Sequence, residues 1–278
     1  MERISRGFRL LKASWTVLQQ DRELLVLPLL SFVLIVIAAT GLGGLGWAAG
    51  LFDNGKQPHS PLFYVLAFAF YFVTYFISIY FNAAVIGAAM KRLEGGDPTV
   101  GDGLRVANSK LGKIAGWAAV AATVGLILRT LEERAGFLGR IAIAFVGAAW
   151  SAVTFFVVPV LLFEPVGVGE GLKRSGRLFK ERWGEQFTGT VGIGLAMFLI
   201  ALPVIAIAVA LGAAAPWLGI AFGVVAIGLL AATGSALSGV FNAALYRFAT
   251  TGEASGAFAA EDLNGTFRPR GGGLFSRN

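Results

Sequence analysis

Two acidic residues, Asp102 and Glu170, occupy the same position in a six-residue pattern that occurs twice in this chain. Residues 100–105 and 168–173 both read Val-Gly-acid-Gly-Leu-base. Two carboxylates brought together could bind a divalent cation or act as general acid and base on a lipid headgroup. An acidic residue near a helix N-terminus is also a common choice for capping. Capping is the interpretation that we prefer, and cation binding or catalysis stays the alternative.

Few other residues could carry catalysis or hold a metal. The chain has no cysteine, which excludes disulfides, thiolate catalysis and cysteine-ligated metals. Its one histidine, His59, lies in a predicted loop beside Pro58 and Pro61, and a metal site needs several ligands. The sequence contains no P-loop, nucleophile elbow, His-Glu-x-x-His helix or dinucleotide fingerprint. We therefore expect a protein that is not an enzyme, with no catalytic residue, cofactor or metal.

The elements that must position these groups are long and apolar. Six stretches have no Asp, Glu, Lys, Arg or His in their interiors: 24–50, 62–90, 114–128, 141–163, 187–212 and 217–246. A soluble domain carries roughly 25% charged residues, whereas this chain carries 14% and is 56% hydrophobic. About 20 apolar residues cross a membrane as a helix, and a membrane β-barrel would show alternating strands instead. The sequence predicts an all-α polytopic membrane bundle with six transmembrane helices.

Basic residues predict the orientation of this bundle. Every Lys and Arg except Lys56, Arg129, Arg134 and Arg140 lies before the first stretch, after the last, or in the second or fourth connection. Cytoplasmic loops carry the excess of Lys and Arg. We therefore expect a multipass protein of the cell membrane with both termini cytoplasmic. The net charge of +7 then favours anionic lipid headgroups, rather than nucleic acid, as the partner.

Three amphipathic segments precede the pairs of predicted spans on this basic side. Their apolar stripes are Ile4, Phe8, Leu11, Trp15 and Leu18; Val100, Leu104, Leu111 and Ile114; and Leu172, Phe179, Trp183 and Phe187. Such helices lie in the membrane interface with their bases toward headgroups, or they pack as ordinary helices on the ends of the spans. The candidate headgroup contacts are Arg3, Arg6, Arg9, Lys12, Lys173, Arg174, Lys180 and Arg182.

Further matches indicate an internal repeat. Residues 9–15 resemble residues 177–183, and Phe-Asn-Ala-Ala occurs at 81–84 and at 241–244. We predict one transmembrane domain, 1–250, built from parallel pseudo-repeats at about 1–95, 96–163 and 164–250. Three-fold symmetry of these repeats about an axis along the membrane normal is our hypothesis. A flexible cytoplasmic tail, 251–278, would follow, because that segment is rich in Gly, Ser and Arg.

Several residues inside the spans are expected to shape helix packing. Asn82 and Asn242, the asparagines of the two Phe-Asn-Ala-Ala segments, form a candidate polar helix-packing pair, since an amide in a membrane needs a partner. Pro203 interrupts the fifth span and should kink it, because proline removes one backbone hydrogen bond, and Pro159 should do the same near the end of the fourth. The alternative for both features is the lining of a substrate pathway.

The chain resembles a family of uncharacterised prokaryotic integral membrane proteins, domain of unknown function 6159. The resemblance is carried by five segments, which are Phe-Asn-Ala-Ala at 81–84, Arg-Leu-Glu-Gly-Gly-Asp-Pro at 92–98, Leu-Glu-Glu-Arg at 131–134, Trp-Gly-Glu-Gln at 183–186 and Ala-Leu-Tyr-Arg at 244–247. It covers nearly the whole chain. It implies a six-span membrane protein and supplies no catalytic residue.

Three functions are therefore weighed. The first is a non-enzymatic membrane scaffold or accessory component that contacts anionic lipids, with oligomerisation and protein partners left open. The second is a transporter for an uncharged or amphipathic solute, because charge-free spans disfavour ion or proton coupling. The third is a lipid-modifying enzyme that uses Asp102 and Glu170.

Overall fold

The computed structural model describes residues 2–50, 61–182, 188–253 and 258, and within them every regular element is helical. The elements are α1 (Glu2–Gln20), the 3-10 helix η1 (Arg22–Leu25), α2 (Val26–Ala48), α3 (Pro61–Leu93), α4 (Val100–Ser109), α5 (Leu111–Arg134), α6 (Phe137–Thr154), α7 (Val157–Phe163), α8 (Val168–Arg182), α9 (Thr188–Ala214) and α10 (Pro216–Thr251). The all-α class is confirmed. Of the predicted tail 251–278, only 251–253 and 258 lie within the described residues.

Six helices are long and apolar enough to cross a membrane, as the sequence predicts. They span Arg22–Ala48, Pro61–Leu93, Leu111–Arg134, Phe137–Phe163, Ile193–Ala214 and Pro216–Thr251. Large apolar side chains cover their outer surfaces: Phe137 and Leu138 are each 79% exposed, and Phe145 is 73% exposed. A soluble protein does not expose a continuous apolar surface of this extent. The chain is a multipass membrane protein.

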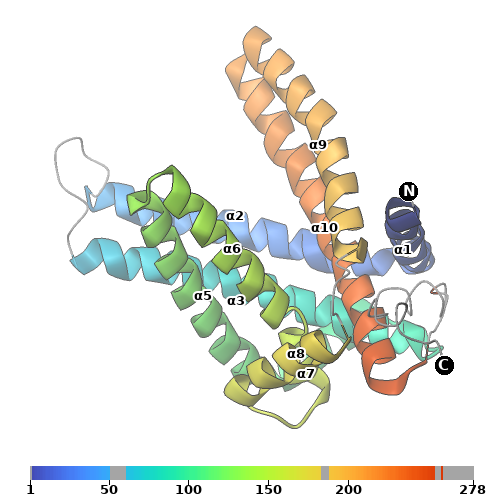
Figure 1. Ribbon diagram of the computed structural model, residues 1–278. Coiled ribbons are helices and arrows are strands. Elements are labelled where there is room, and N and C mark those ends of the chain that lie inside the picture. The colour runs from blue at the N-terminus through green and yellow to red at the C-terminus, as the bar shows by residue number, and fades with distance from the viewer. Residues whose placement is uncertain (1, 51–60, 183–187, 254–257, 259–278) are drawn as a thin grey trace, which may run out of the picture.

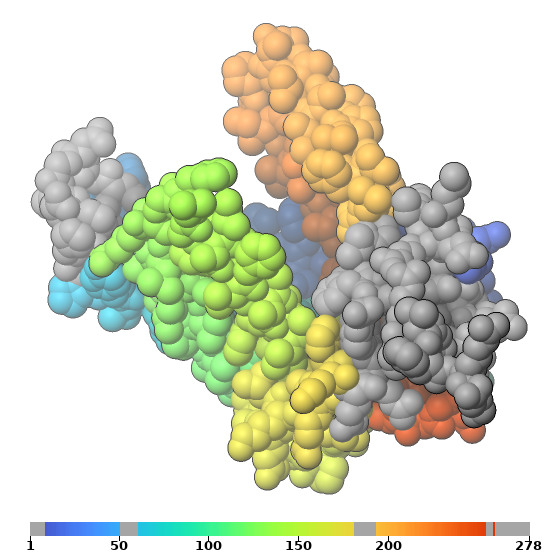
Figure 2. All heavy atoms as spheres, in the orientation of Figure 1, coloured from blue at the N-terminus to red at the C-terminus, as the bar shows by residue number. Residues whose placement is uncertain are grey.

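The six long helices form three hairpins that diverge from one shared region (Figure 1). The hairpin of α2 and α3 and the hairpin of α9 and α10 point in different directions, and α5 packs along α3. Figure 2 shows α9 and α10 projecting away from the rest of the molecule. We call the shared region the junction, which comprises α1, η1, α4, α7, α8 and the adjoining ends of α3 and α10.

The main hydrophobic core lies in the junction. Small residues of the two Phe-Asn-Ala-Ala segments are buried there, with Ala83 and Ala243 both fully inaccessible. Gly239 lies so close to α3 that a Cβ on it would sit 2.6 Å from Val85 Cγ1. Small side chains let helix backbones approach closely in membranes. These segments therefore allow α3 and α10 to cross at the centre of the fold.

Each amphipathic helix packs against a hairpin other than the one that follows it. α4 packs on α3, α8 packs on α6 and α7, and α1 packs on α9 and α10. This packing is cyclic: α4 and α8 each cover the hairpin before them, and α1 covers the hairpin of α9 and α10. The three-fold repeat itself stays a prediction.

The buried face of α1 differs from the predicted stripe. Leu10, Ser14 and Val17 are buried, whereas Trp15 is 42% exposed and Leu11 is half-buried. Leu18 is buried as predicted, and the side chains of residues 2–8 lie outside the described part. The small Ala13 and Ser14 let α1 approach α9 and α10 closely, so this sector packs inward. Trp15 lies beside this sector and stays partly exposed.

The other two stripes are also displaced. α4 ends at Ser109, so the predicted stripe crosses two helices, with the exposed Leu111 and the buried Ile114 belonging to α5. On α8, Ser175 and Leu178 are buried, and the predicted Leu172 and Phe179 flank them half-buried. Small residues such as glycine, alanine and serine contribute little to an apolar stripe in the sequence, but they occupy the closest contacts between helices. Residues 183 and 187 lie outside the described part of the chain.

Candidate functional site

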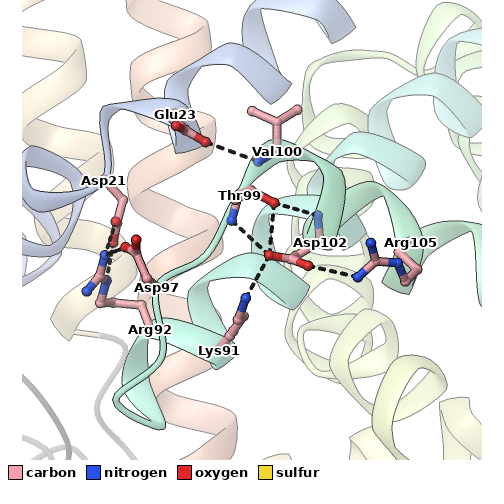
Figure 3. Close-up of polar contacts among 9 residues, drawn as sticks. All are labelled: Asp21, Glu23, Lys91, Arg92, Asp97, Thr99, Val100, Asp102 and Arg105. Carbon is pink, nitrogen blue, oxygen red and sulfur yellow. Dashed lines mark hydrogen bonds and ion pairs between the residues drawn. The ribbon is translucent and has the colours of Figure 1, made fainter.

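The first polar network of the junction joins the start of the first span to the end of the second (Figure 3). The Arg92 guanidinium donates two hydrogen bonds to Asp21, from Nε to Oδ2 and from Nη2 to Oδ1. Its Nη2 also donates to Asp97 Oδ1 at 2.6 Å. The side chain of Asp21 is 5% exposed and that of Arg92 25%, whereas Asp97 is 89% exposed. The pair is thus a largely desolvated, bidentate ion pair.

A tight turn after α3 brings Asp97 back to Arg92. The Gly96 N–H donates to the Lys91 carbonyl and the Gly95 N–H to the Arg92 carbonyl, which is the Schellman pattern. Gly95 has φ of 86°, a conformation that favours glycine. This geometry gives the Arg-Leu-Glu-Gly-Gly-Asp-Pro segment a physical explanation, because its glycines form the turn and its outer charges pair.

The acidic residue of the first repeated motif caps α4. Thr99 Oγ1 accepts from the Asp102 N–H at 3.2 Å, and Asp102 Oδ2 accepts from the Thr99 N–H at 3.1 Å, which is a capping box. Lys91 donates to Asp102 Oδ2 at 2.7 Å and Arg105 donates to Oδ1 at 2.9 Å. Glu23 Oε2 accepts from the Val100 N–H at 3.3 Å, so the start of the first span also touches this cap.

These contacts keep Asp102 ionised. The hydrogen bond from the Lys91 ammonium, followed by those from the Thr99 hydroxyl and N–H, holds the pKa of the Asp102 carboxyl well below its usual range. A carboxyl whose pKa is depressed by folding stabilises the folded state above its unfolded pKa, and that contribution is lost as the pH falls. Asp102 is therefore poorly suited to donate or take up a proton near neutral pH.

A pH titration of stability tests this assignment. We expect the difference in Tm between the wild type and Asp102→Asn to stay constant from about pH 8 to about pH 5 and to shrink below about pH 4, the ordinary range of an aspartate. Thermal unfolding in detergent at a series of pH values measures it. A difference that already disappeared near neutral pH would contradict the low pKa.

Glu170, the counterpart of Asp102, lies exposed in the first turn of α8. Within the described residues the structure gives no polar contact that joins Glu170 to Asp102, and no group of three or more potential metal ligands. The carboxylate pair weighed from the sequence therefore has no geometric support in the described part of the chain.

A second polar network joins α5, α8 and α10 around Glu164, at the end of α7. Arg174 Nε donates to both carboxylate oxygens of Glu164 at 3.2 Å, and the Tyr246 hydroxyl donates to Oε1 at 3.2 Å. Lys113 Nζ donates to the carbonyls of Leu161 at 3.4 Å and Glu164 at 3.2 Å. A lysine at the last carbonyls of a helix satisfies acceptors that have no partner within the helix.

The fourth span is broken between α6 and α7, upstream of Pro159. Proline has no N–H, so the Phe155 carbonyl, four residues earlier, lacks its helical donor. Asn242 Nδ2 donates to this carbonyl at 3.0 Å. The buried Ser175 donates to the Val153 carbonyl at 2.6 Å and accepts from the Phe156 N–H at 3.0 Å. Residues of α8 and α10 thus replace the hydrogen bonds that the break removes.

The two prolines therefore behave differently. The expected interruption occurs before Pro159, but α9 runs continuously from Thr188 to Ala214 through Pro203. Pro203 thus lies inside a continuous helix, and the kink expected there stays a prediction. Proline is tolerated within membrane helices when neighbouring groups or local adjustment compensate for the missing hydrogen bond.

Replacing Asn242 with Leu should expose the cost of this break. The Phe155 carbonyl would lose its donor, and we expect the free energy of unfolding to fall by about 0.6–2 kcal/mol, the range for interhelical hydrogen bonds in membranes. Pro159→Ala supplies a backbone N–H, so Asn242→Leu should cost less in that background. A double-mutant cycle measured by unfolding in mixed micelles checks this. An unchanged cost would contradict the assigned role of Asn242.

The asparagine pair itself stays a prediction. Asn82 lies at the same crossing, since a Cβ on Gly239 would be 3.8 Å from Asn82 Nδ2. Asn242 Oδ1 is buried without a hydrogen-bond partner among the described residues. Both amides thus lie at interfaces between helices.

The structure places part of the predicted headgroup set on exposed surface. Arg9 and Lys12 of α1 and Lys173 and Lys180 of α8 are exposed, whereas Arg174 is paired with Glu164. The side chains of Arg3, Arg6 and Arg182 lie outside the described part.

Two residues of the polar networks, Asp21 and Ser175, were not predicted from the sequence. Asp21 follows the first apolar stripe and Ser175 lies between Leu172 and Phe179 of the third, and neither position identifies a partner far along the chain.

A family of unknown function, DUF6159, matches residues 62–257, so the match begins at α3. Comparisons with curated proteins and with solved structures found no match. The matched range contains the turn after α3, both repeated motifs and the partners of the broken fourth span. On the strength of this match over most of its length, the chain belongs to the DUF6159 family.

Proposed function

We propose that this protein is a non-enzymatic scaffold or accessory component of the cell membrane, with both termini in the cytoplasm, and that it contacts anionic lipids through the helices of the junction. The observation that carries the proposal is the set of exposed bases on α1 and α8, at the end of the bundle where both polar networks lie. Asp21, Asp102 and Glu164 there are engaged in ion pairs, so the exposed bases on α1 and α8 add to the attraction for anionic headgroups.

A scaffold role is supported by where the ionic groups are used. Asp21, Asp102 and Glu164 each hold neighbouring helices together through basic partners. A group engaged in this way stabilises the arrangement of the hairpins and is not available as a reactive acid or base. We infer that the junction is a rigid platform at the cytoplasmic face.

Introduced thiols test the orientation, because the chain has no cysteine. Ser109→Cys lies at the end of α4, and Gly136→Cys lies in the turn between α5 and α6, where a Cβ has nothing within 4 Å. We expect an impermeant maleimide to label Ser109→Cys only from the cytoplasmic side and Gly136→Cys only from the other. Labelling of both from one side would overturn the topology.

Thermal stabilisation by added lipid tests the headgroup contact. Anything that binds the folded state raises its stability, so phosphatidylglycerol should raise the Tm of the delipidated protein more than phosphatidylcholine does. Lys173→Gln with Lys180→Gln should reduce that preference. The matched control, Arg134→Gln with Arg140→Gln, removes two exposed bases from the opposite end and should not. Equal stabilisation of the wild type by both lipids would refute lipid contact through charge.

A transporter is the second candidate, and one cavity favours it. A space of about 190 Å³ between α2, α3 and α10 is lined by Ser31, Ser78 and Ser235. None of the three hydroxyls has a hydrogen-bond partner in the described part of the chain, and Ser31 is only 8% exposed. Ser78 and Ser235 are half-buried. Three hydroxyls that line one space favour an occupant with a polar group. The volume is below the roughly 300–1,000 Å³ of ligand pockets, so transport ranks second.

Proteoliposomes test this alternative with glycerol as the uncharged probe. A transporter should increase glycerol permeability in stopped-flow light scattering, and Ser78→Leu, which fills the cavity, should remove the increase. Ser109→Ala, which lies outside the cavity, is the control. Permeability equal to that of protein-free vesicles would exclude a glycerol-sized path.

A further inference from the structure

An apolar groove of about 640 Å³ lies where α1 meets the last hairpin. Its walls come from α9 and α10, and α1 closes one end with Leu11, Lys12 and Trp15. The remaining walls include Met197, Ile200 and Leu230. This volume falls within the roughly 300–1,000 Å³ of pockets that bind small molecules.

The chemistry of the groove separates a polar end from an apolar remainder. Thr233 lines it, but its hydroxyl donates to the Leu229 carbonyl at 2.9 Å, so this residue asks for no polar partner. Lys12 is exposed, and the described residues give its ammonium no ion pair. The groove therefore offers one cation at its α1 end and apolar walls elsewhere.

The depth of the groove matches part of an acyl chain. Leu230 and Leu237 lie seven positions apart on α10, which is about 10 Å along a helix. The α1 end lies at the junction, and the other end lies along the exposed apolar surface of the hairpin, where Ile200 is 46% exposed. An occupant would thus run from the membrane interface toward the bilayer interior.

The buried face of α1 differs from its predicted apolar stripe, and this difference leaves apolar side chains of α1 available to the occupant. The helix buries Leu10 and Val17 against the protein, yet it also presents Leu11 and Trp15 to the groove. Tryptophan favours the membrane interface, because its ring is apolar and its indole N–H can bond to water or to headgroups. Lysine stems lie along apolar surface while the ammonium reaches headgroups. The second apolar sector of α1 is therefore suited to a lipid.

We propose that this groove binds one anionic phospholipid, with an acyl chain between α9 and α10 and the headgroup phosphate at Lys12. The inference rests on the proposed function in one respect, the placement of α1 at an anionic membrane surface. It adds a single defined site to the general attraction of the exposed bases.

The test uses the full-length protein in nanodiscs that contain phosphatidylglycerol carrying a diazirine in one acyl chain. After photolysis, mass spectrometry maps the crosslinked peptides. We expect crosslinks to concentrate on groove residues of α9 and α10, and unlabelled phosphatidylglycerol should compete more effectively than phosphatidylcholine. A lysine near an anionic surface contributes about 1 kcal/mol, so Lys12→Gln should reduce this preference about fivefold.

Two tryptophan substitutions on α9 give a matched comparison. Ile200→Trp fills the groove and should remove its crosslinks, whereas Ile207→Trp, 48% exposed in the wild type on the same helix but outside the groove, should leave them unchanged. Because both side chains are already about half exposed, neither substitution disturbs a buried core.

The outcomes separate this inference from the proposed function. Crosslinks spread evenly over exposed apolar faces, or unaffected by Ile200→Trp, would overturn the groove site, whatever the result for Lys173 and Lys180. Crosslinks confined to the groove but competed equally by both lipids would overturn the assignment of the headgroup to Lys12. A groove crosslinked to residues of the chain itself would show that protein fills it and would also overturn the proposal.

Discussion

Replacing Arg92 with Ala is expected to lower the free energy of unfolding by about 3–5 kcal/mol, because the substitution leaves the buried Asp21 carboxylate without its partner. Asp21 accepts both guanidinium hydrogen bonds and is almost inaccessible to water. Unfolding titration in SDS-containing mixed micelles measures the effect. Arg92→Lys should recover only part of the loss, since an ammonium cannot form the bidentate arrangement.

Arg105→Ala provides the control for charge removal. Arg105 also pairs with an aspartate, but its side chain is 79% exposed. Exposed ion pairs contribute about 0–1 kcal/mol, so this variant should remain close to the wild type. Similar losses for Arg92→Ala and Arg105→Ala would show that net charge, and not the buried pair, controls stability.

The second large effect is expected at Gly103, where α4 packs against α3. A Cβ at this position would lie 2.5 Å from the Ala84 carbonyl oxygen, and a backbone atom cannot move away cheaply. Overpacking of this kind costs typically about 1–3 kcal/mol. We expect Gly103→Ala to lower the free energy of unfolding by about 3 kcal/mol, the upper end of this range, in the same titration.

Gly101, two residues earlier in the same motif, should respond in the opposite direction. A Cβ there meets only Thr99 Oγ1 at 3.7 Å. Alanine is favoured over glycine inside a helix by about 0.5–1 kcal/mol, so Gly101→Ala should be neutral or stabilising. Equal destabilisation by the two substitutions would mean that the motif acts through helix flexibility and not through close packing.

The second copy of the motif extends the comparison. A Cβ on Gly171 would lie 2.8 Å from Leu161 Cδ2, the end of a side chain that can rotate away, and Gly169 has open space. Gly171→Ala should therefore destabilise the protein less than Gly103→Ala does. The motif thus places its second glycine against the preceding helix in both copies, and its acid in the first turn.

The six spans could be predicted from the sequence because their signal is local. Length and apolarity decide whether a helix crosses a membrane, and the charged ends at Lys91, Arg92 and Arg247 only extend the helices beyond the apolar stretches. The capping role of Asp102 was also local, since its partner Thr99 lies three residues away.

The junction could not be predicted in the same way, because its contacts join distant residues. Asp21 and Arg92 are 71 positions apart, and Asn242 and Phe155 are 87 apart. Nothing in the spacing of one partner identifies the other. The buried face of α1 was missed for a different reason. The large apolar Trp15 was counted in the predicted stripe, whereas the small residues Ala13 and Ser14 occupy the buried face.

The closure of α1 on the last hairpin has a consequence for how the chain matures. α1 is synthesised before α9 and α10, yet it packs against these two helices and buries Leu10 and Val17. Contacts between such distant segments form late, because a long loop must close before they gain stability. Docking of α1 is thus a late step in folding, because it requires that α9 and α10 have already been synthesised and inserted into the membrane.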